Sequence, residues 1–178
     1  MIKDFGDTYS TNKDKVYNLA LHYAQNREDA EEIMQNVFVA VYQNLSKFNE
    51  DATIETWIYR ITINKSLDFL KAKNRKKRLG PFYNLFFDDT FTIKHNNNDF
   101  DHPGVLLEQK EAVKRIFDQL HQLPERQKTV LILCKIEHQP IDKVAEILNL
   151  SPKAVESLLQ RAKVNLQKKL NQNEGNKS

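Results

Sequence analysis

Residues 151–170, SPKAVESLLQRAKVNLQKKL, place hydrogen-bonding and cationic side chains on one face of a predicted helix. Serine caps helix N-termini and proline is favoured at the first helical position, so Ser151 and Pro152 predict a helix start. The outer face then carries Ser151, Lys153, Ser157, Gln160 and Arg161. Gln and Arg can pair with base edges in the major groove, whereas Lys mainly contacts phosphates. The face therefore favours DNA binding, with an ordinary solvated helix surface as the alternative.

The preceding residues, IDKVAEILNL at 141–150, complete the pattern of a helix-turn-helix. Val144 and Leu148 would bury the first helix, and Ala145 is small where two helices would cross closely. Asn149 stands at the turn, and asparagine tolerates a positive φ better than most side chains. Leu150 would fill the turn. A helix of this motif can enter the major groove of B-DNA.

A second stripe that could contact nucleic acid runs along a helix predicted at 54–73. Most of its circumference is apolar, but one narrow stripe carries Trp57, Arg60, Asn64, Asp68 and Lys71. A run of cations follows, consisting of Lys71, Lys73, Arg75, Lys76, Lys77 and Arg78. A ring can stack on a base, an amide can read a base edge, and cations neutralise phosphates. The alternatives are that Trp57 is a core residue and that the basic run is a solvated helix end.

Residues 28–46 form a third predicted helix, with Ile33, Val37 and Val41 on its apolar face. It opens with Glu28, Asp29, Glu31 and Glu32. Acids stabilise a helix N-terminus, so capping alone could explain them. They also repel DNA, which makes a protein partner with basic residues plausible for this face.

The arrangement of glycine and proline predicts how these elements are organised. No glycine or proline occurs between Gly6 and Gly80, and alternating β-branched runs are missing, so we predict an all-α protein. Two small helical domains, 1–79 and 105–170, would be joined by a flexible linker at 80–104 and followed by a polar tail at 171–178. Helices are expected at 10–26, 28–46, 54–73, 105–121, 124–136, 140–148 and 151–170. Pro124, Pro140 and Pro152 would each be a first helical residue. The linker holds six Phe or Tyr residues, which could pack locally or dock into a partner.

Composition excludes several classes of protein. The 178 residues carry a net charge of only +3, and the single cysteine, Cys134, excludes an internal disulfide and fits a reducing cytoplasm. No apolar run reaches the length of a membrane span, so we expect a cytoplasmic protein. His95 to His102, KHNNNDFDH, is the best metal candidate but lacks a helical His pair. We therefore predict no metal, no cofactor, no catalytic residues and no enzymatic activity.

Together the three segments resemble the extracytoplasmic-function (ECF) group of bacterial RNA polymerase sigma factors of the sigma-70 family. DAEEIMQNVFVAVYQNLSKF resembles region 2.2, which binds the clamp coiled-coil of the largest polymerase subunit. TWIYRITINKSLDFLKAKNRKKR resembles regions 2.3 and 2.4, which melt and read the −10 element. Residues 120–170 resemble region 4, which reads the −35 element.

The resemblance implies a role for each surface. Core RNA polymerase would be bound by Asp29, Glu32, Gln35, Asn36 and Phe38. The −10 element would be contacted by Asn49, Thr53, Trp57, Arg60, Asn64, Lys71, Arg75 and Lys76, with loop 48–55 holding a flipped base. The −35 duplex would be contacted by Ser151, Lys153, Ser157, Gln160 and Arg161. The linker would thread toward the RNA exit path, and an anti-sigma factor, often membrane-bound, would control the protein.

The chain departs from the family pattern in three places. Glu50–Asp51 and Ile54 stand where the family loop usually has a Gly and a Phe. Glu156 and Leu158 replace common basic residues, and His138 replaces the Gly common before the helix-turn-helix. The expected function is an alternative sigma factor that directs core polymerase to promoters. The alternative is a stand-alone helix-turn-helix transcription regulator, which would need no −10 stripe and no acidic docking face.

Overall fold

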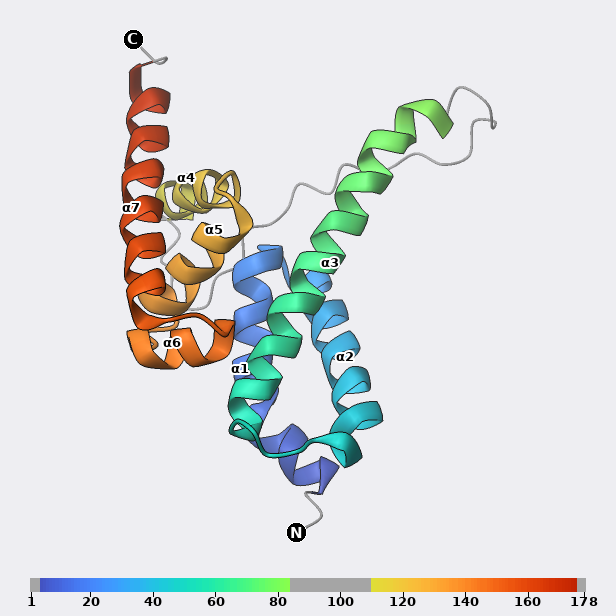
Figure 1. Cartoon of the computed structure of the whole chain (residues 1–178). Helices are drawn as coiled ribbons and strands as arrows, with labels where there is room; N and C mark the ends of the chain where they lie inside the picture. The colour runs from blue at the N-terminus through green and yellow to red at the C-terminus, as the bar shows by residue number, and fades with distance from the viewer. Residues whose placement is uncertain (1–3, 84–109, 176–178) are drawn as a thin grey trace. The chain divides into compact units, whose positions relative to one another are not determined.

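The computed structural model describes residues 4–83 and 110–175, and the side chains of 4–75 and 111–172. All regular elements among them are helical, which confirms the all-α prediction (Figure 1). The α-helices are α1 (Phe5–Ala24), α2 (Arg27–Asn44), α3 (Ile54–Tyr83), α4 (Lys110–His121), α5 (Glu125–Leu131), α6 (Ile141–Leu148) and α7 (Pro152–Gly175). A 3₁₀ turn at Leu45–Lys47 follows α2, and a π-helical turn at Ile132–Ile136 follows α5.

The chain divides into two compact units. The first takes the described residues of Met1–Lys47 and Ile61–His102, and the second takes those of Phe48–Arg60 and Pro103–Ser178. Helix α3 therefore contributes its first two turns to the second unit and its later turns to the first. The predicted limits of the two domains, 1–79 and 105–170, stay a prediction. The grouping of Phe48–Arg60 with the C-terminal helices rests on contacts between residues far apart in the chain.

In the first unit, α1 and α2 pack against each other through Leu19, Tyr23, Ile33 and Val37, all buried. A tight turn joins them: Gln25 adopts a left-handed conformation with φ of 62°, and Asn26 caps α2. The Asn26 side chain accepts a hydrogen bond from the Asp29 backbone N–H at 2.9 Å. The local sequence thus ends one helix and starts the next within two residues.

In the second unit, α7 packs against α4, α5 and α6. Its buried side chains include Val155 and Ala162, and α6 contributes Val144 and Ala145. The turn between α6 and α7 has the predicted form. Asn149 has a φ of 52°, and its backbone N–H donates to the carbonyls of Ala145 and Glu146 at the end of α6. The Ser151 hydroxyl accepts a hydrogen bond from the Ala154 N–H at 3.2 Å, which confirms it as the cap of α7.

Several predicted helix boundaries were wrong. Helix α3 runs ten residues beyond position 73 to Tyr83, so Gly80 and Pro81 lie inside a helix rather than opening the linker. Helix α7 likewise continues through most of the predicted tail. Pro124 and Pro140 are cap residues with extended ψ, one position before the helix, whereas Pro152 is a first helical residue as predicted. Glycine and proline lower the stability of a helix without forbidding it, and a shift of one residue at a proline lies within the usual uncertainty of helix ends.

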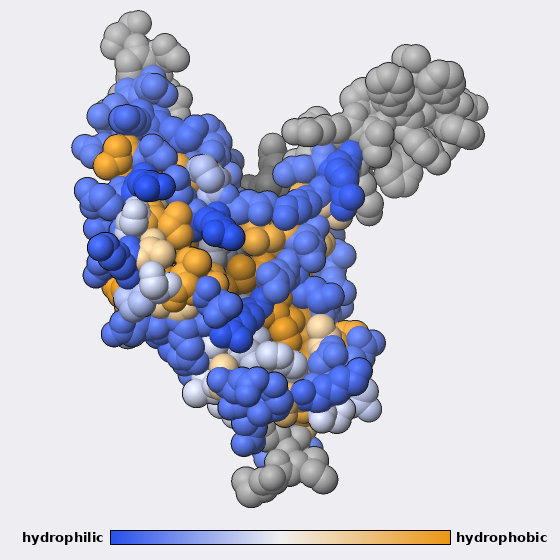
Figure 2. Space-filling model, viewed as in Figure 1, coloured by the Kyte–Doolittle hydropathy of each residue, from blue (hydrophilic) through white to orange (hydrophobic). Residues whose placement is uncertain are grey.

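Several predicted features lie outside the described residues. They are 84–104 of the linker with the metal candidate between His95 and His102, the first residues of the helix predicted at 105–121, and 176–178 of the tail. Among the described residues, no group of three His, Cys, Asp or Glu side chains could hold a metal ion. Within that part of the chain, no helix is both long and apolar enough to span a membrane. The face seen in Figure 2 is largely hydrophilic, with apolar side chains showing between the polar ones.

Candidate nucleic-acid interface

The outer face of α7 is arranged as the sequence predicts. Its inner residues Val155, Leu159 and Ala162 are buried, and these positions recur with the period of a helix. The predicted −35 side chains, Ser151, Lys153, Ser157, Gln160 and Arg161, are all exposed. The capped N-terminus of α7 adds the positive end of a helix dipole, which favours a phosphate. The helix therefore offers one polar, cationic face.

Helix α3 carries the second predicted stripe. Asn64, Lys71 and Arg75 are exposed, whereas Trp57 and Arg60 are half-buried. The Trp57 ring lies 5.2 Å from the Phe48 ring, measured between centroids, so it is partly held by the loop before the helix. Lys76 lies beyond the described side chains. This stripe is thus exposed over its later turns and partly covered at its start.

Loop 48–53 leads into α3. Asn49 is exposed and its amide donates to Asp51 at 2.5 Å, and Glu50 adopts a left-handed conformation with φ of 61°. Glu50 stands in the segment where the resembling family usually has a Gly, and Gly adopts this conformation without strain. Thr53 caps α3 by accepting a hydrogen bond from the Thr56 N–H at 3.2 Å. Thr53 is therefore a helix cap as well as a predicted DNA contact.

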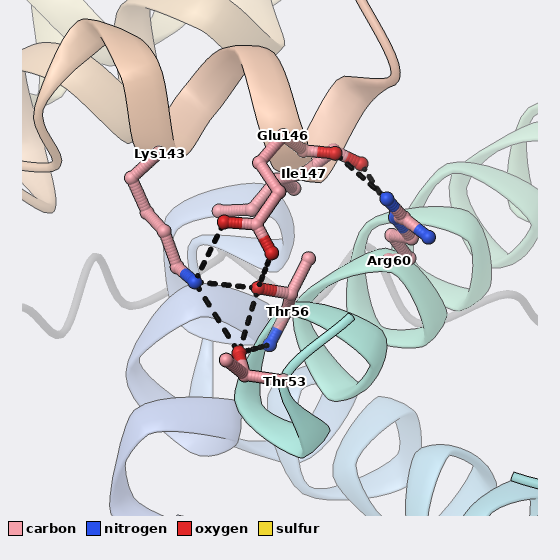
Figure 3. A network of polar contacts seen from close by, with 6 residues as sticks. All are labelled: Thr53, Thr56, Arg60, Lys143, Glu146 and Ile147. Carbon is pink, nitrogen blue, oxygen red and sulfur yellow. Dashed lines mark hydrogen bonds and ion pairs between the residues drawn. The ribbon is translucent and has the colours of Figure 1, made fainter. Parts of the chain in front are cut away.

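Arg60 has well-defined partners at the end of α6. Its Nε donates to the Ile147 carbonyl at 3.0 Å and its Nη2 to the Glu146 carbonyl at 2.7 Å (Figure 3). The last carbonyls of a helix lack intrahelical partners and carry the negative end of its dipole. The Arg60 guanidinium donates to two of these carbonyls and places a positive charge at the negative end of the dipole. Arg60 therefore acts as a cap on α6, the first helix of the helix-turn-helix.

Beside Arg60, a network of side chains links the first turn of α3 to α6 (Figure 3). Thr56 donates to the Glu146 carboxylate at 2.8 Å, and Lys143 donates to the Thr56 hydroxyl at 2.6 Å and to the Thr53 hydroxyl at 3.3 Å. Lys143 also pairs with Glu146 at 3.1 Å. The hydrogen bonds from Thr56 and Lys143 lower the pKa of Glu146, so its carboxylate is charged at neutral pH.

Tyr59, one turn further along α3, is buried and adds a third link. Its hydroxyl donates to Glu137 at 3.4 Å and accepts from the Gln139 amide at 3.2 Å. Burial, followed by the negative charge of Glu137, raises the pKa of Tyr59 far above its usual value. The phenol therefore stays protonated and can serve as a donor at neutral pH. No local sequence pattern predicts this link, since Tyr59 and Glu137 are 78 residues apart along the chain.

On α2, the predicted polymerase-binding residues fall into two groups. Glu32, Gln35 and Asn36 are exposed, and Gln35 lines an open hollow together with Tyr9. Asp29 is mostly buried and bonded to Asn26 at 2.8 Å and to Lys73 of α3.

Phe38 is also buried, and its ring packs against Tyr9 with centroids 4.6 Å apart. Asp29 and Phe38 thus support the first unit directly. Their predicted contact with polymerase stays a prediction.

Comparisons with known proteins match both halves of the chain. Residues 8–76 match the family model for sigma-70 region 2, and residues 114–166 match that for sigma-70 region 4. Over 173 residues the chain is 30% identical to the ECF RNA polymerase sigma factor SigW of Bacillus subtilis, covering 93% of this chain and 88% of the relative. Over 170 residues it is 27% identical to the ECF sigma-E factor of Haemophilus influenzae, covering 94% and 88% respectively.

Solved structures share the fold. The sigma factor RpoE of Bartonella quintana, solved with the anti-sigma factor NepR, matches with a TM-score of 0.64 at 16% identity, covering 96% of this chain and 98% of that one. CnrH, solved with the cytosolic domain of CnrY, matches with a TM-score of 0.63 at 21% identity, covering 94% and 87%. Both regions, their order and the similarity along nearly the whole chain agree with the resemblance of its motifs: the protein belongs to the ECF group of the sigma-70 family of RNA polymerase sigma factors.

Proposed function

We propose that this sigma factor, which directs RNA polymerase to promoters, reads the −35 duplex with the outer face of α7. The observation that supports this most directly is the division of α7 into a buried apolar side and an exposed side with Lys153, Gln160 and Arg161. A helix with this division, capped and preceded by the α6 turn, fits the major groove. Gln160 and Arg161 would read base edges, and Lys153 would contact phosphate.

The −10 element would be contacted by loop 48–55 and α3. Asn64 is exposed and its amide can read the edge of an unpaired base, while Lys71 and Arg75 can neutralise phosphates. Trp57 would stack at the upstream edge of the melted region. Melting would use binding energy alone, and we assign the chain no catalytic residues and no cofactor.

Core polymerase would dock on the exposed side of α2. Glu32, Gln35 and Asn36 lie there and can pair with a basic, hydrogen-bonding partner surface. Asp29 and Phe38 would act mainly by holding this helix in place. The solved relatives with bound partners support a further proposal, namely that an anti-sigma factor also binds this chain in the cytoplasm.

In vitro transcription tests the function. Core polymerase supplied with this chain should start RNA at a new set of promoters, and the mapped start sites should share −35 and −10 sequences. Glu32→Arg should weaken polymerase association, whereas Glu111→Arg, the same charge change at an exposed position of α4, should not.

A stand-alone regulator would give a different pattern. It would bind its DNA tightly without polymerase, and start sites would be the same with and without the chain. That pattern, together with no association with core polymerase, would rule out the proposed function.

A further inference from the structure

Glu156 is an exposed acid on a helix whose other charged residues are cations. It is the only Asp or Glu of α7 between Pro152 and Asn173, a stretch with the cations Lys153, Arg161, Lys163, Lys168 and Lys169. It lies three residues after Lys153 and four before Gln160, so these three exposed side chains are neighbours on the helix surface. No hydrogen bond or ion pair joins its carboxylate to another described residue.

The fold has little use for a carboxylate at this position. Acids stabilise a helix within its first turn, but Glu156 is the fifth residue of α7 and lies beyond that turn. The packing of α7 comes from buried side chains such as Val155 and Ala162. An exposed side chain outside such packing changes stability little when it is replaced. The charge of Glu156 therefore matters for what α7 contacts rather than for how α7 folds.

The place of Glu156 along α7 puts it where base edges are contacted. In a helix-turn-helix the N-terminal part of the second helix contacts base edges in the major groove. The Ser151 cap fixes the start of α7, so Glu156 lies one turn nearer that start than Gln160 does. A carboxylate next to phosphates would be repelled, so in a groove it needs a hydrogen-bond donor on a base.

The donors in the major groove identify the base. Guanine presents only acceptors there, and thymine presents an acceptor and a methyl group. Adenine has an N6 donor, but the N7 acceptor beside it repels a carboxylate. Cytosine presents the N4 amino group as a donor with no acceptor of its own, and Glu accepts a hydrogen bond from that group. Cytosine is thus the base that fits Glu156.

We propose that Glu156 is a specificity-determining residue, whose carboxylate accepts a hydrogen bond from the N4 amino group of a cytosine in the −35 element. The inference rests on the proposed function, because it assigns the −35 duplex to the outer face of α7. One helical turn of about 5.4 Å separates Glu156 from Gln160, and base pairs are about 3.4 Å apart. The cytosine therefore lies about one or two base pairs from the pair that Gln160 reads.

Transcription from promoter variants tests the assignment. Core polymerase with the full-length chain is given the mapped promoter with each of the four bases at every −35 position in turn. Wild type should prefer cytosine at one position by about fivefold or more, as expected for one mismatched base pair. Glu156→Gln should prefer adenine at that position alone, because a glutamine amide pairs with adenine N6 and N7. Glu156→Ala should accept all four bases there.

Two other variants separate this inference from the proposed function. Glu111→Gln, the same chemical change at an exposed position of α4, is the matched control and should leave every preference as in wild type. Arg161→Ala should relax the preference at a different −35 position. If Arg161→Ala did so while both Glu156 variants kept the wild-type preferences, the proposed function would stand and the role of Glu156 would be overturned. A wild-type chain that did not redirect polymerase would overturn both.

A modified base tests the hydrogen bond itself. N4-methylcytosine keeps the N4 proton that pairs with guanine and replaces the proton that points into the major groove. With this base at the preferred position, transcription by wild type should fall about fivefold or more, while transcription by Glu156→Ala should stay unchanged. An equal loss in both chains would contradict the bond. A uniform gain for Glu156→Gln on every sequence would mean that the carboxylate is only repelled by phosphates, and would also overturn the proposal.

Discussion

The outer face of α7 and the start of α3 carry similar side chains in different situations. On α7, Gln160 and Arg161 are exposed on a helix whose opposite side is buried. On α3, Arg60 caps another helix and Thr53 belongs to a hydrogen-bond network. The family resemblance predicts DNA contacts for both sets, but Thr53 and Arg60 already make hydrogen bonds to α6, whereas Gln160 and Arg161 lie on the exposed face of α7.

The difference shows that residue type and spacing indicate what a side chain can bind, but not whether it is available. An arginine that meets the last carbonyls of a helix contributes to folding whether or not it also binds DNA. An arginine exposed on a helix surface contributes little to stability. Mutations should therefore separate the two regions by their effects on stability and on promoter use.

The largest expected effect is the loss of promoter use on changing the α7 face. Arg161→Ala should lower transcription from a −35-dependent promoter by about 10- to 100-fold, because a base-edge arginine contact contributes roughly 1–3 kcal/mol. The unfolding free energy should stay within about 0.5 kcal/mol of wild type, since the side chain is exposed. In vitro transcription and urea unfolding measure the two quantities. Lys163→Ala, also exposed on α7 but outside the predicted set, is the control.

Arg60→Ala should instead change both the transcription from the promoter and the free energy of unfolding. It leaves two carbonyls at the end of α6 without their charged donor, so the unfolding free energy should fall by about 1–2 kcal/mol. Urea unfolding of the full-length chain measures this loss, and Arg60→Lys should recover only part of it because lysine cannot match the two-pronged geometry. An Arg60→Ala protein as stable as Arg161→Ala would contradict the distinction between the two regions.

Much of the fold could be predicted from the sequence because helices are encoded locally. The period of Ile33, Val37 and Val41 and the Asn149–Ser151 turn are patterns within a few residues, and the structure has them as expected. Helix ends were less predictable. Gly80 and Pro81 are usually breakers, but α3 continues past both of them.

The hydrogen bonds between the start of α3 and α6 could not be predicted in the same way. Thr56 and Glu146 are 90 residues apart in sequence, and neither residue type is unusual at its position. Asp29 is a second example of a long-range partner that the sequence does not indicate. The acidic run that suggested a docking surface gives no indication that Asp29 pairs with Lys73. Available and occupied side chains look alike until the long-range partners are known.

A smaller effect concerns the backbone just before the helix-turn-helix. His138 has a φ of 53°, so this chain keeps a left-handed conformation where the family commonly has Gly. A side chain in that region costs about 1 kcal/mol, and His138→Gly should raise the unfolding free energy by up to that amount. Asn149→Gly, at a φ of 52°, should gain less because asparagine tolerates the conformation. Urea unfolding of both variants measures whether His138→Gly gains more unfolding free energy than Asn149→Gly.

The smallest expected effect is a pH dependence of stability that comes from the bonds of Glu146 on α6 to Thr56 on α3 and to Lys143. The hydrogen bond from Thr56 and those from Lys143 lower the pKa of Glu146, with Arg60 as a further nearby cation. A carboxyl whose pKa is lowered in the folded state stabilises that state above its ordinary pKa of 4.5, and this contribution is lost as the pH falls through the lowered value. The free energy of unfolding should therefore be greater in wild type than in Glu146→Gln at pH 7, and the difference should shrink toward pH 4. Urea unfolding of the two chains across this pH range measures the difference, and comparing them removes the effect of all other carboxyl groups. A difference that stayed constant across this range would mean that the charge of Glu146 does not hold α6 to α3.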